Sequence, residues 1–181
     1  MSASKQPLDS KVLITGGTAG IGLATAEALL GEGHDVFICG RNKQKLQDAL
    51  EKLESVAVGR KVSGAICDVR NYDSVCDMVD QATGAMGGLD ALVNNAGIGL
   101  IQSIEDLSPD DWRDMIDINL TGVFNCCKAA LPALKKSTKA NIINLGSRAG
   151  RYAFAGGTAY NATKFGLQGF SEALYLDLSQ Y

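Results

Sequence analysis

The sequence predicts an α/β fold in which helices cover both faces of a parallel, five-stranded sheet. Short runs rich in apolar and β-branched residues alternate along the chain with longer segments of helical periodicity. The short runs are apolar on both faces instead of alternating, which is typical of strands buried between two layers of helices. These two observations indicate a doubly wound, Rossmann-like sheet with the strand order 3-2-1-4-5.

Each strand is expected where a short apolar run is bounded by glycine or polar residues. In chain order these runs are "KVLIT" (11–15), "DVFIC" (35–39), "VSGAIC" (62–67), "ALVNN" (91–95) and "NIINL" (141–145). Helices are expected at 20–32, 42–54, 71–84, 108–135 and 159–180. The fourth begins with a capping serine, Ser108, followed by Pro109 and two acidic residues that suit the positive end of a helix dipole.

Composition indicates one ordinary globular domain over residues 1–181. The chain is 46% hydrophobic and 20% charged, without an internal repeat, a low-complexity tract or a boundary to a second domain. A net charge of −3 argues against a nucleic-acid partner, and no apolar run is long enough to span a membrane.

Five cysteines without a C-x-x-C pair favour a reducing, cytoplasmic setting. Cys39 and Cys67 fall in expected strands, where a free thiol behaves as a small hydrophobe. The single histidine, His34, is expected to be an exposed loop residue. A Ser-His-Asp arrangement and a histidine-rich metal site are therefore disfavoured, and no metal is expected.

Sites in such a sheet lie at the carboxyl ends of the strands, so the residues that follow each strand are the first candidates. Gly16, Gly20 and Gly22 follow the first strand and open a helix. Glycines there allow a tight turn, a close approach of the backbone to a pyrophosphate and close helix packing. Simple turn chemistry is the alternative, but the strand–loop–helix setting favours a dinucleotide.

The second strand ends in Gly40 and Arg41, where an acid would select NAD by binding the ribose hydroxyls. A guanidinium can instead hold a 2′-phosphate in a bidentate pair, so NADP(H) is favoured and NAD is less favoured. An arginine on the surface of the next helix is the alternative.

Tyr160 and Lys164 lie one helical turn apart in "YNATK", which puts both side chains on one face. A phenol loses its proton near pH 10, and a fixed ammonium beside it favours the phenolate. Such a pair is suited to proton transfer at neutral pH. By itself the pentapeptide also fits a half-buried tyrosine beside a lysine that extends to solvent.

Together these motifs resemble the short-chain dehydrogenase/reductase family, single-domain branch, from Lys11 onward. "TGGTAGIG" resembles its phosphate loop, and "NNAG" the segment that supports the sheet. The four positions that match its catalytic tetrad are Asn119, Ser147, Tyr160 and Lys164. Ala19 stands where the sugar-nucleotide epimerase branch would have a glycine, which disfavours that branch.

The resemblance implies a carbonyl reductase or alcohol dehydrogenase in which Tyr160 exchanges the proton with the substrate oxygen. Lys164 would hold the nicotinamide ribose, Ser147 would orient the substrate, and Asn119 would hold a water on the proton path. The positions implied to contact cofactor are Gly16, Thr18, Gly20, Ile21, Gly22, Arg41, Asp68, Val69, Asn95, Tyr160 and Lys164. Three residues also have plain structural alternatives: Asp68 as a helix cap, Asn119 as a bend in its helix, and Ser147 as a turn residue.

The family continues beyond the Tyr-x-x-x-Lys helix, so the resemblance implies a chain that lacks the family's final strands. We therefore expect the strand 141–145 to be a bare sheet edge, and the chain to bind NADPH, turn over slowly and aggregate. The alternative function is a non-catalytic or weakly active dinucleotide-binding fragment.

Helix 159–180 is expected to join copies of the chain into a homodimer or homotetramer. Its polar residues form a narrow stripe of Asn161, Gln168, Glu172 and Ser179, and apolar residues cover most of the remainder. Gly166 and Gly169 would permit a close approach of the partner.

Overall fold

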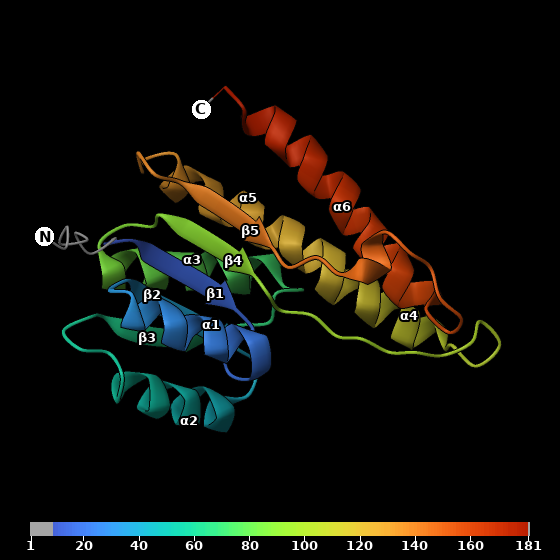
Figure 1. Cartoon of the computed structure of the whole chain (residues 1–181), viewed down its shortest axis with the longest axis horizontal. Coiled ribbons are helices and arrows are strands. Elements are labelled where there is room, and N and C mark those ends of the chain that lie inside the picture. Colours follow the sequence, from blue (N-terminus) through green and yellow to red (C-terminus); the bar gives the residue numbers. More distant parts are fainter. Residues whose placement is uncertain (1–8, 181) are drawn as a thin grey trace, which may run out of the picture.

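A computed structural model of the chain describes residues 9–180 and has the expected parallel sheet, with the strand order β3-β2-β1-β4-β5 (Figure 1). The strands are β1 (Lys11–Thr15), β2 (Asp35–Gly40), β3 (Val62–Ile66), β4 (Ala91–Asn94) and β5 (Asn141–Asn144). The fold class and strand order predicted from the sequence are therefore confirmed. Because all five strands are parallel, their carboxyl ends meet at one edge of the sheet.

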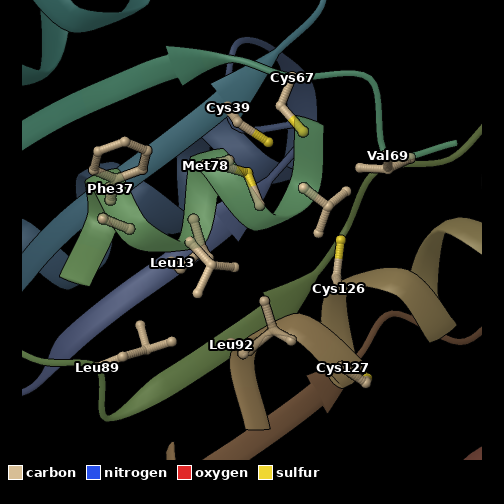
Figure 2. Close-up of a cluster of buried hydrophobic side chains, with 14 of the residues drawn as sticks. Leu13, Phe37, Cys39, Cys67, Val69, Met78, Leu89, Leu92, Cys126 and Cys127 are labelled. Atoms are coloured by element: carbon tan, nitrogen blue, oxygen red, sulfur yellow. The ribbon is translucent and has the colours of Figure 1, made fainter. Parts of the chain in front are cut away.

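The helices are α1 (Gly20–Gly31), α2 (Lys43–Glu54), α3 (Tyr72–Met86), α4 (Pro109–Ile116), α5 (Gly122–Leu134) and α6 (Thr158–Leu178). Alternate residues of β1 point to opposite faces of the sheet. Leu13 packs with α3, α5 and α6, whereas Val12 and Ile14 pack with α1 and α2. Helices thus cover both faces, and the larger cluster lies on the α3 side (Figure 2).

Three helices begin where a side chain accepts a hydrogen bond from the first turn. Asn42, Asn71 and the predicted Ser108 cap α2, α3 and α4 in this way. The first residue of α1 follows Ala19, which has no side-chain oxygen to offer. The amino end of α1 thus keeps its backbone N–H groups available to an anion.

The helix expected over 108–135 is one continuous helical segment with a change of pitch. Between α4 and α5 lies a π-helical turn, Asp117–Thr121. A π turn inserts an extra residue per turn and is often found at functional sites. Asn119 sits inside it, and its side chain is buried.

The expectation for His34 is wrong, because this residue is buried and only 8% exposed. Its Nδ1 accepts a 3.2 Å hydrogen bond from the Ser10 backbone N–H, so the turn is held against the chain that leads into β1. Within residues 9–180, no helix combines the length and the apolar character that crossing a bilayer requires.

Candidate active site

A pocket of about 180 Å³ lies at the carboxyl ends of β1, β2, β3 and β4. Five of the expected cofactor positions line it: Gly16, Thr18, Arg41, Asp68 and Val69. They come from three separate strand ends, which is the convergence that a parallel sheet predicts.

The glycine loop needs glycine for two different reasons. Gly16 and Gly20 have φ angles of 65° and 54°, in the left-handed region that other residues avoid. A Cβ at Gly20 would meet open space, so the positive φ angle, and not a close contact, favours glycine there. The turn faces outward at the start of α1. Gly22 is different, because a Cβ there would collide with the Asn95 side chain and the Gly16 carbonyl.

Asn95 fastens β4 to the glycine loop. Its Nδ2 donates to the carbonyl oxygens of Thr15 and Gly16, at 2.9 and 3.0 Å. In return, the Thr15 hydroxyl accepts from the backbone N–H groups of Asn95 and Ala96. Asn95 therefore shapes the loop. It is not one of the residues that line the pocket.

Thr18 and Arg41 both line the pocket. A Cβ at Gly40 would collide with Thr18, so the glycine at the end of β2 lets the loop pack against that strand. Arg41 is exposed, and Ile21 is an apolar side chain left 64% exposed in the first turn of α1. Arg41 lines the pocket, whereas Ile21 lies outside the pocket lining.

Asp68 is held by an arginine that sequence reasoning missed. The Nε of Arg70 donates to both carboxylate oxygens of Asp68 at 3.0 Å, and its Nη2 donates to Oδ2 at 2.7 Å. The Nη1 of Arg70 donates to Asp114 at 2.9 Å. The Arg70 hydrogen bonds lower the pKa of Asp68, so this carboxylate is charged at neutral pH. The signal in the sequence was only the local spacing Asp68-x-Arg70.

Lys164 lies beside Tyr160, with its Nζ 5.9 Å from the centre of the phenol ring. The Nζ also donates a 2.7 Å hydrogen bond to the Leu145 carbonyl at the end of β5. Burial lowers the pKa of Lys164, because it disfavours the charged ammonium. The two residues expected to move a proton thus share one helical face, as their spacing predicts.

Asn119 connects the π turn to the helix of Tyr160. Its amide exchanges two 2.8 Å hydrogen bonds with the Ile98 backbone. The Nδ2 also donates to the Thr163 hydroxyl at 3.2 Å, and Thr163 donates to the Tyr160 carbonyl at 2.9 Å. The amide of Asn119 is therefore used in hydrogen bonds within the protein. The backbone of Asn119 lies in the π-helical turn.

Ser147 stands at the start of a short 3₁₀ turn, Arg148–Gly150, and is exposed. Its Oγ accepts a 3.1 Å hydrogen bond from the Ala149 N–H, which matches the alternative of a turn residue. Ser147 and Lys164 both line an open hollow of about 520 Å³ between β5 and α6. Tyr160 borders Gly99 instead, where a Cβ would lie 3.6 Å from the ring.

A second asparagine network behind the site was also missed. Asn94 donates to Asn144 at 2.8 Å, and Asn144 donates to Ser171 at 2.8 Å, which joins β4, β5 and α6. Asn161, predicted to lie on a polar surface stripe of α6, is buried and hydrogen-bonds the 149–154 loop. The sequence indicated this network only through asparagines that lie inside apolar strands or motifs, where a buried amide needs hydrogen-bond partners.

The comparisons with known proteins show the family and the fold. The family model for short chain dehydrogenase matches residues 10–181. A 3-dehydrosphinganine reductase of Arabidopsis thaliana, TSC10B, is 43% identical over 166 residues, which are 90% of this chain and 49% of that protein. The chain thus spans about half the length of this curated relative.

Two solved structures share the fold closely. A variant of actinorhodin polyketide ketoreductase with NADPH has a TM-score of 0.87 and 36% identity, over 93% of this chain and 65% of that one. An NAD⁺-bound xylitol dehydrogenase has a TM-score of 0.91 and 31% identity, over 97% and 68%. Both nicotinamide dinucleotides thus occur among similar structures.

Proposed function

Because the chain belongs to the short-chain dehydrogenase family, we propose that it is an NADP(H)-dependent oxidoreductase acting on a carbonyl or alcohol substrate. The observation that carries this proposal is the pairing of Tyr160 with Lys164 on one helical face, near the strand ends. The dinucleotide, when bound, supplies or accepts the hydride.

The residues at the pocket fit such a cofactor. The uncapped amino end of α1 and the outward-facing turn at Gly20 suit a pyrophosphate, which prefers free backbone N–H groups. Arg41 at the mouth suits a 2′-phosphate, and the ketoreductase structure with NADPH supports the same choice. The charged Asp68 suits a hydrogen-bond donor on the adenosine half.

In the proposed mechanism, Tyr160 Oη donates its proton to the substrate carbonyl oxygen during reduction and accepts it from the alcohol during oxidation. Lys164 favours the phenolate that remains, because its ammonium lies on the same helical face, 5.9 Å from the ring centre. Ser147 Oγ–H is free to donate to the substrate oxygen, since the bond from Ala149 uses it only as an acceptor. The buried Asn119 holds the helix of Tyr160 in place through Thr163.

The test is an absorbance assay with purified protein, NADPH and a panel of ketones and aldehydes. Tyr160→Phe should abolish turnover and leave NADPH binding by calorimetry intact, because it removes only the transferable proton. Tyr152→Phe is the matched control, since Tyr152 is an exposed tyrosine whose carbonyl, not its hydroxyl, is engaged. Equal turnover in wild type and Tyr160→Phe would contradict the mechanism.

A dinucleotide-binding protein without significant turnover is the second candidate. The open hollow beside Ser147 and Lys164 favours this candidate. Its volume of about 520 Å³ admits water, which raises the local dielectric. Calorimetric binding of NADPH with no turnover across the whole panel would support this candidate.

A further inference from the structure

Two buried cysteines lie together under the pocket at the strand ends. Cys39 is in β2, Cys67 directly follows β3, and both line the 180 Å³ pocket. Figure 2 shows the two side chains next to each other, with both sulfur atoms directed to the same side of the strands. In the strand register Cys39 stands opposite Ala65, so Cys67 lies two residues further along on the same face, and its N–H donates to the Gly40 carbonyl at 3.1 Å.

The two thiols belong to a chain of hydrogen bonds that starts in the glycine loop. The Gly16 N–H donates to the Cys39 sulfur, and the Cys39 thiol donates to Cys67. Cys67 in turn donates to the Ser74 carbonyl in the first turn of α3, at 3.6 Å. The hydrogen bond from Cys39 lowers the pKa of Cys67, while the pKa of Cys39 is raised by the same contact. Cys67 is therefore the better nucleophile of the two.

The remaining cysteines have different surroundings. Cys126 is close to both thiols, but burial raises its pKa. Burial also raises the pKa of Cys127, to about 11, and its sulfur accepts from Asn94 Nδ2 at 3.3 Å. Cys76 is partly exposed on α3 and lies outside this cluster. It serves as a control.

We propose that Cys39 and Cys67 form a redox-active thiol pair, which a hydroperoxide closes to a disulfide that opposes dinucleotide binding. The Cys67 sulfur attacks one peroxide oxygen, the O–O bond breaks, and the thiol proton leaves with the other oxygen as water or alcohol. The Cys39 sulfur then attacks the resulting sulfenic sulfur, the S–O bond breaks, and the hydroxyl leaves with the Cys39 proton as water. Two thiols lose two electrons and two protons in total, and the peroxide takes them up.

The position of the pair explains why its oxidation would reach the ligand. Each cysteine immediately precedes residues of the pocket: Gly40 and Arg41 follow Cys39, and Asp68 and Val69 follow Cys67. A disulfide holds its sulfur atoms about 2 Å apart, closer than hydrogen-bonded thiols, so it draws the ends of β2 and β3 together. It also removes the Cys39 thiol proton from the chain of hydrogen bonds.

Oxidant reaches the thiols through the pocket that a dinucleotide would fill, so bound NADPH should protect them. This protection rests on the proposed function, whereas the disulfide itself does not. The two parts of the proposal are therefore tested by separate readouts.

The first readout is the cross-link. Folded, reduced protein is treated with hydrogen peroxide, and its intact mass and non-reduced peptides are measured. We expect a loss of about 2 Da and a peptide joining residues 39 and 67. Cys76→Ser should keep this link, and Cys39→Ala should lose it and leave a Cys67 sulfenic acid that dimedone traps. Wild-type protein without the 39–67 link, or with Cys67 joined to Cys126, would overturn the assignment whether or not the variants fold.

The second readout is the coupling to NADPH. At free NADPH ten times its Kd, about one-tenth of the protein is unliganded, so we expect oxidation to slow about tenfold. We expect the oxidised protein to bind NADPH about tenfold more weakly and to regain affinity after dithiothreitol. An unchanged oxidation rate, with NADPH binding measured by calorimetry, would refute the coupling. A 39–67 link in protein that never binds NADPH would support the thiol pair and contradict the proposed function.

Discussion

The Asn161 side chain donates a 2.7 Å hydrogen bond to the carbonyl of Ala149. It also donates to the Tyr152 carbonyl at 3.0 Å, and its Oδ1 accepts from the Phe154 N–H. One buried amide therefore holds the loop that follows Ser147 on the first turn of α6. Since Asn161 directly follows Tyr160, it fixes the loop relative to the proposed proton donor.

We predict that Asn161→Ala lowers kcat by about tenfold or more while the KM for NADPH stays nearly constant, because misplacing catalytic groups by about 1 Å has large effects on rate. Asn161→Asp should behave similarly, since a carboxylate cannot donate to the two carbonyls. Steady-state kinetics, with thermal unfolding to establish folding, is the measurement. Gln168→Ala on the same helix is the control. An unchanged kcat in folded Asn161→Ala would show that the loop does not need this anchor.

Arg41 should determine the preference for NADPH over NADH. Its guanidinium lines the pocket mouth, and a charge-assisted bidentate pair with a 2′-phosphate contributes about 2 kcal/mol. We expect Arg41→Ala to weaken NADPH binding by that amount and to leave NADH binding nearly unchanged, measured by calorimetry at fixed salt. Lys43→Ala removes a nearby exposed charge and controls for the general field. Equal losses for both cofactors would mean that Arg41 does not contact the phosphate.

The sequence alone predicted the features that depend on local pattern. The five strands, their order and the capping by Ser108 follow from periodicity and residue chemistry, and the structure agrees with them. The sequence did not predict the features that depend on contacts between residues far apart in the chain. His34 accepts a hydrogen bond from Ser10, Arg70 is held by Asp114, and the Asn119 side chain is held by the Ile98 backbone. None of these partners is set by spacing within one element.

The lowered pKa of Lys164 predicts a pH dependence of stability. Between its folded-state pKa and the ordinary value of 10.5, the unfolded chain binds more protons at this position than the folded chain. Stability rises with pH wherever the unfolded state binds more protons. The free energy of unfolding of wild type should therefore increase, relative to Lys164→Met, as pH rises from 7 toward 10. Urea denaturation of both proteins at several pH values measures this. A difference that is constant with pH would contradict a lysine destabilised by burial.

We propose that copies of the chain associate through α6. Leu167 is buried, and Phe170 and Leu174 pack on the core, so these residues are already used within the chain. Gly166 is likewise used, because a Cβ there would lie 3.2 Å from Leu120, whereas Gly169 faces open space. The surface left for a partner comprises Phe165, Gly169 and Leu176, with Phe165 and Leu176 47% and 70% exposed.

Phe165→Glu should therefore shift the protein toward monomer at micromolar concentration, because it places a charge in an apolar contact. Light scattering measures the mass. Tyr175→Glu is the control, since Tyr175 is an exposed aromatic residue of the same helix that is not part of the surface formed by Phe165, Gly169 and Leu176. A monomeric wild type, or a Phe165→Glu variant of unchanged mass, would contradict association through this surface.

The strand β5 forms one edge of the sheet. This strand pairs only with β4 among residues 9–180, so its outer row of backbone N–H and C=O groups faces open hollows of about 520 and 650 Å³. Its side chains differ by face. Ile142 packs against the core on the α3 side of the sheet. Ile143 points to the opposite face, which α1 and α2 cover only at other strands, and is 51% exposed. A flat, apolar edge of this kind templates pairing with another strand, and natural sheets suppress such pairing with a lysine.

We therefore expect wild type to aggregate with a steep dependence on concentration, and Ile143→Lys to slow the growth of scattered light about tenfold. Val58→Lys, at an apolar residue 90% exposed and distant from this edge, adds the same charge and should change little. Equal protection by the two lysines would assign the effect to net charge and remove β5 as the site of association.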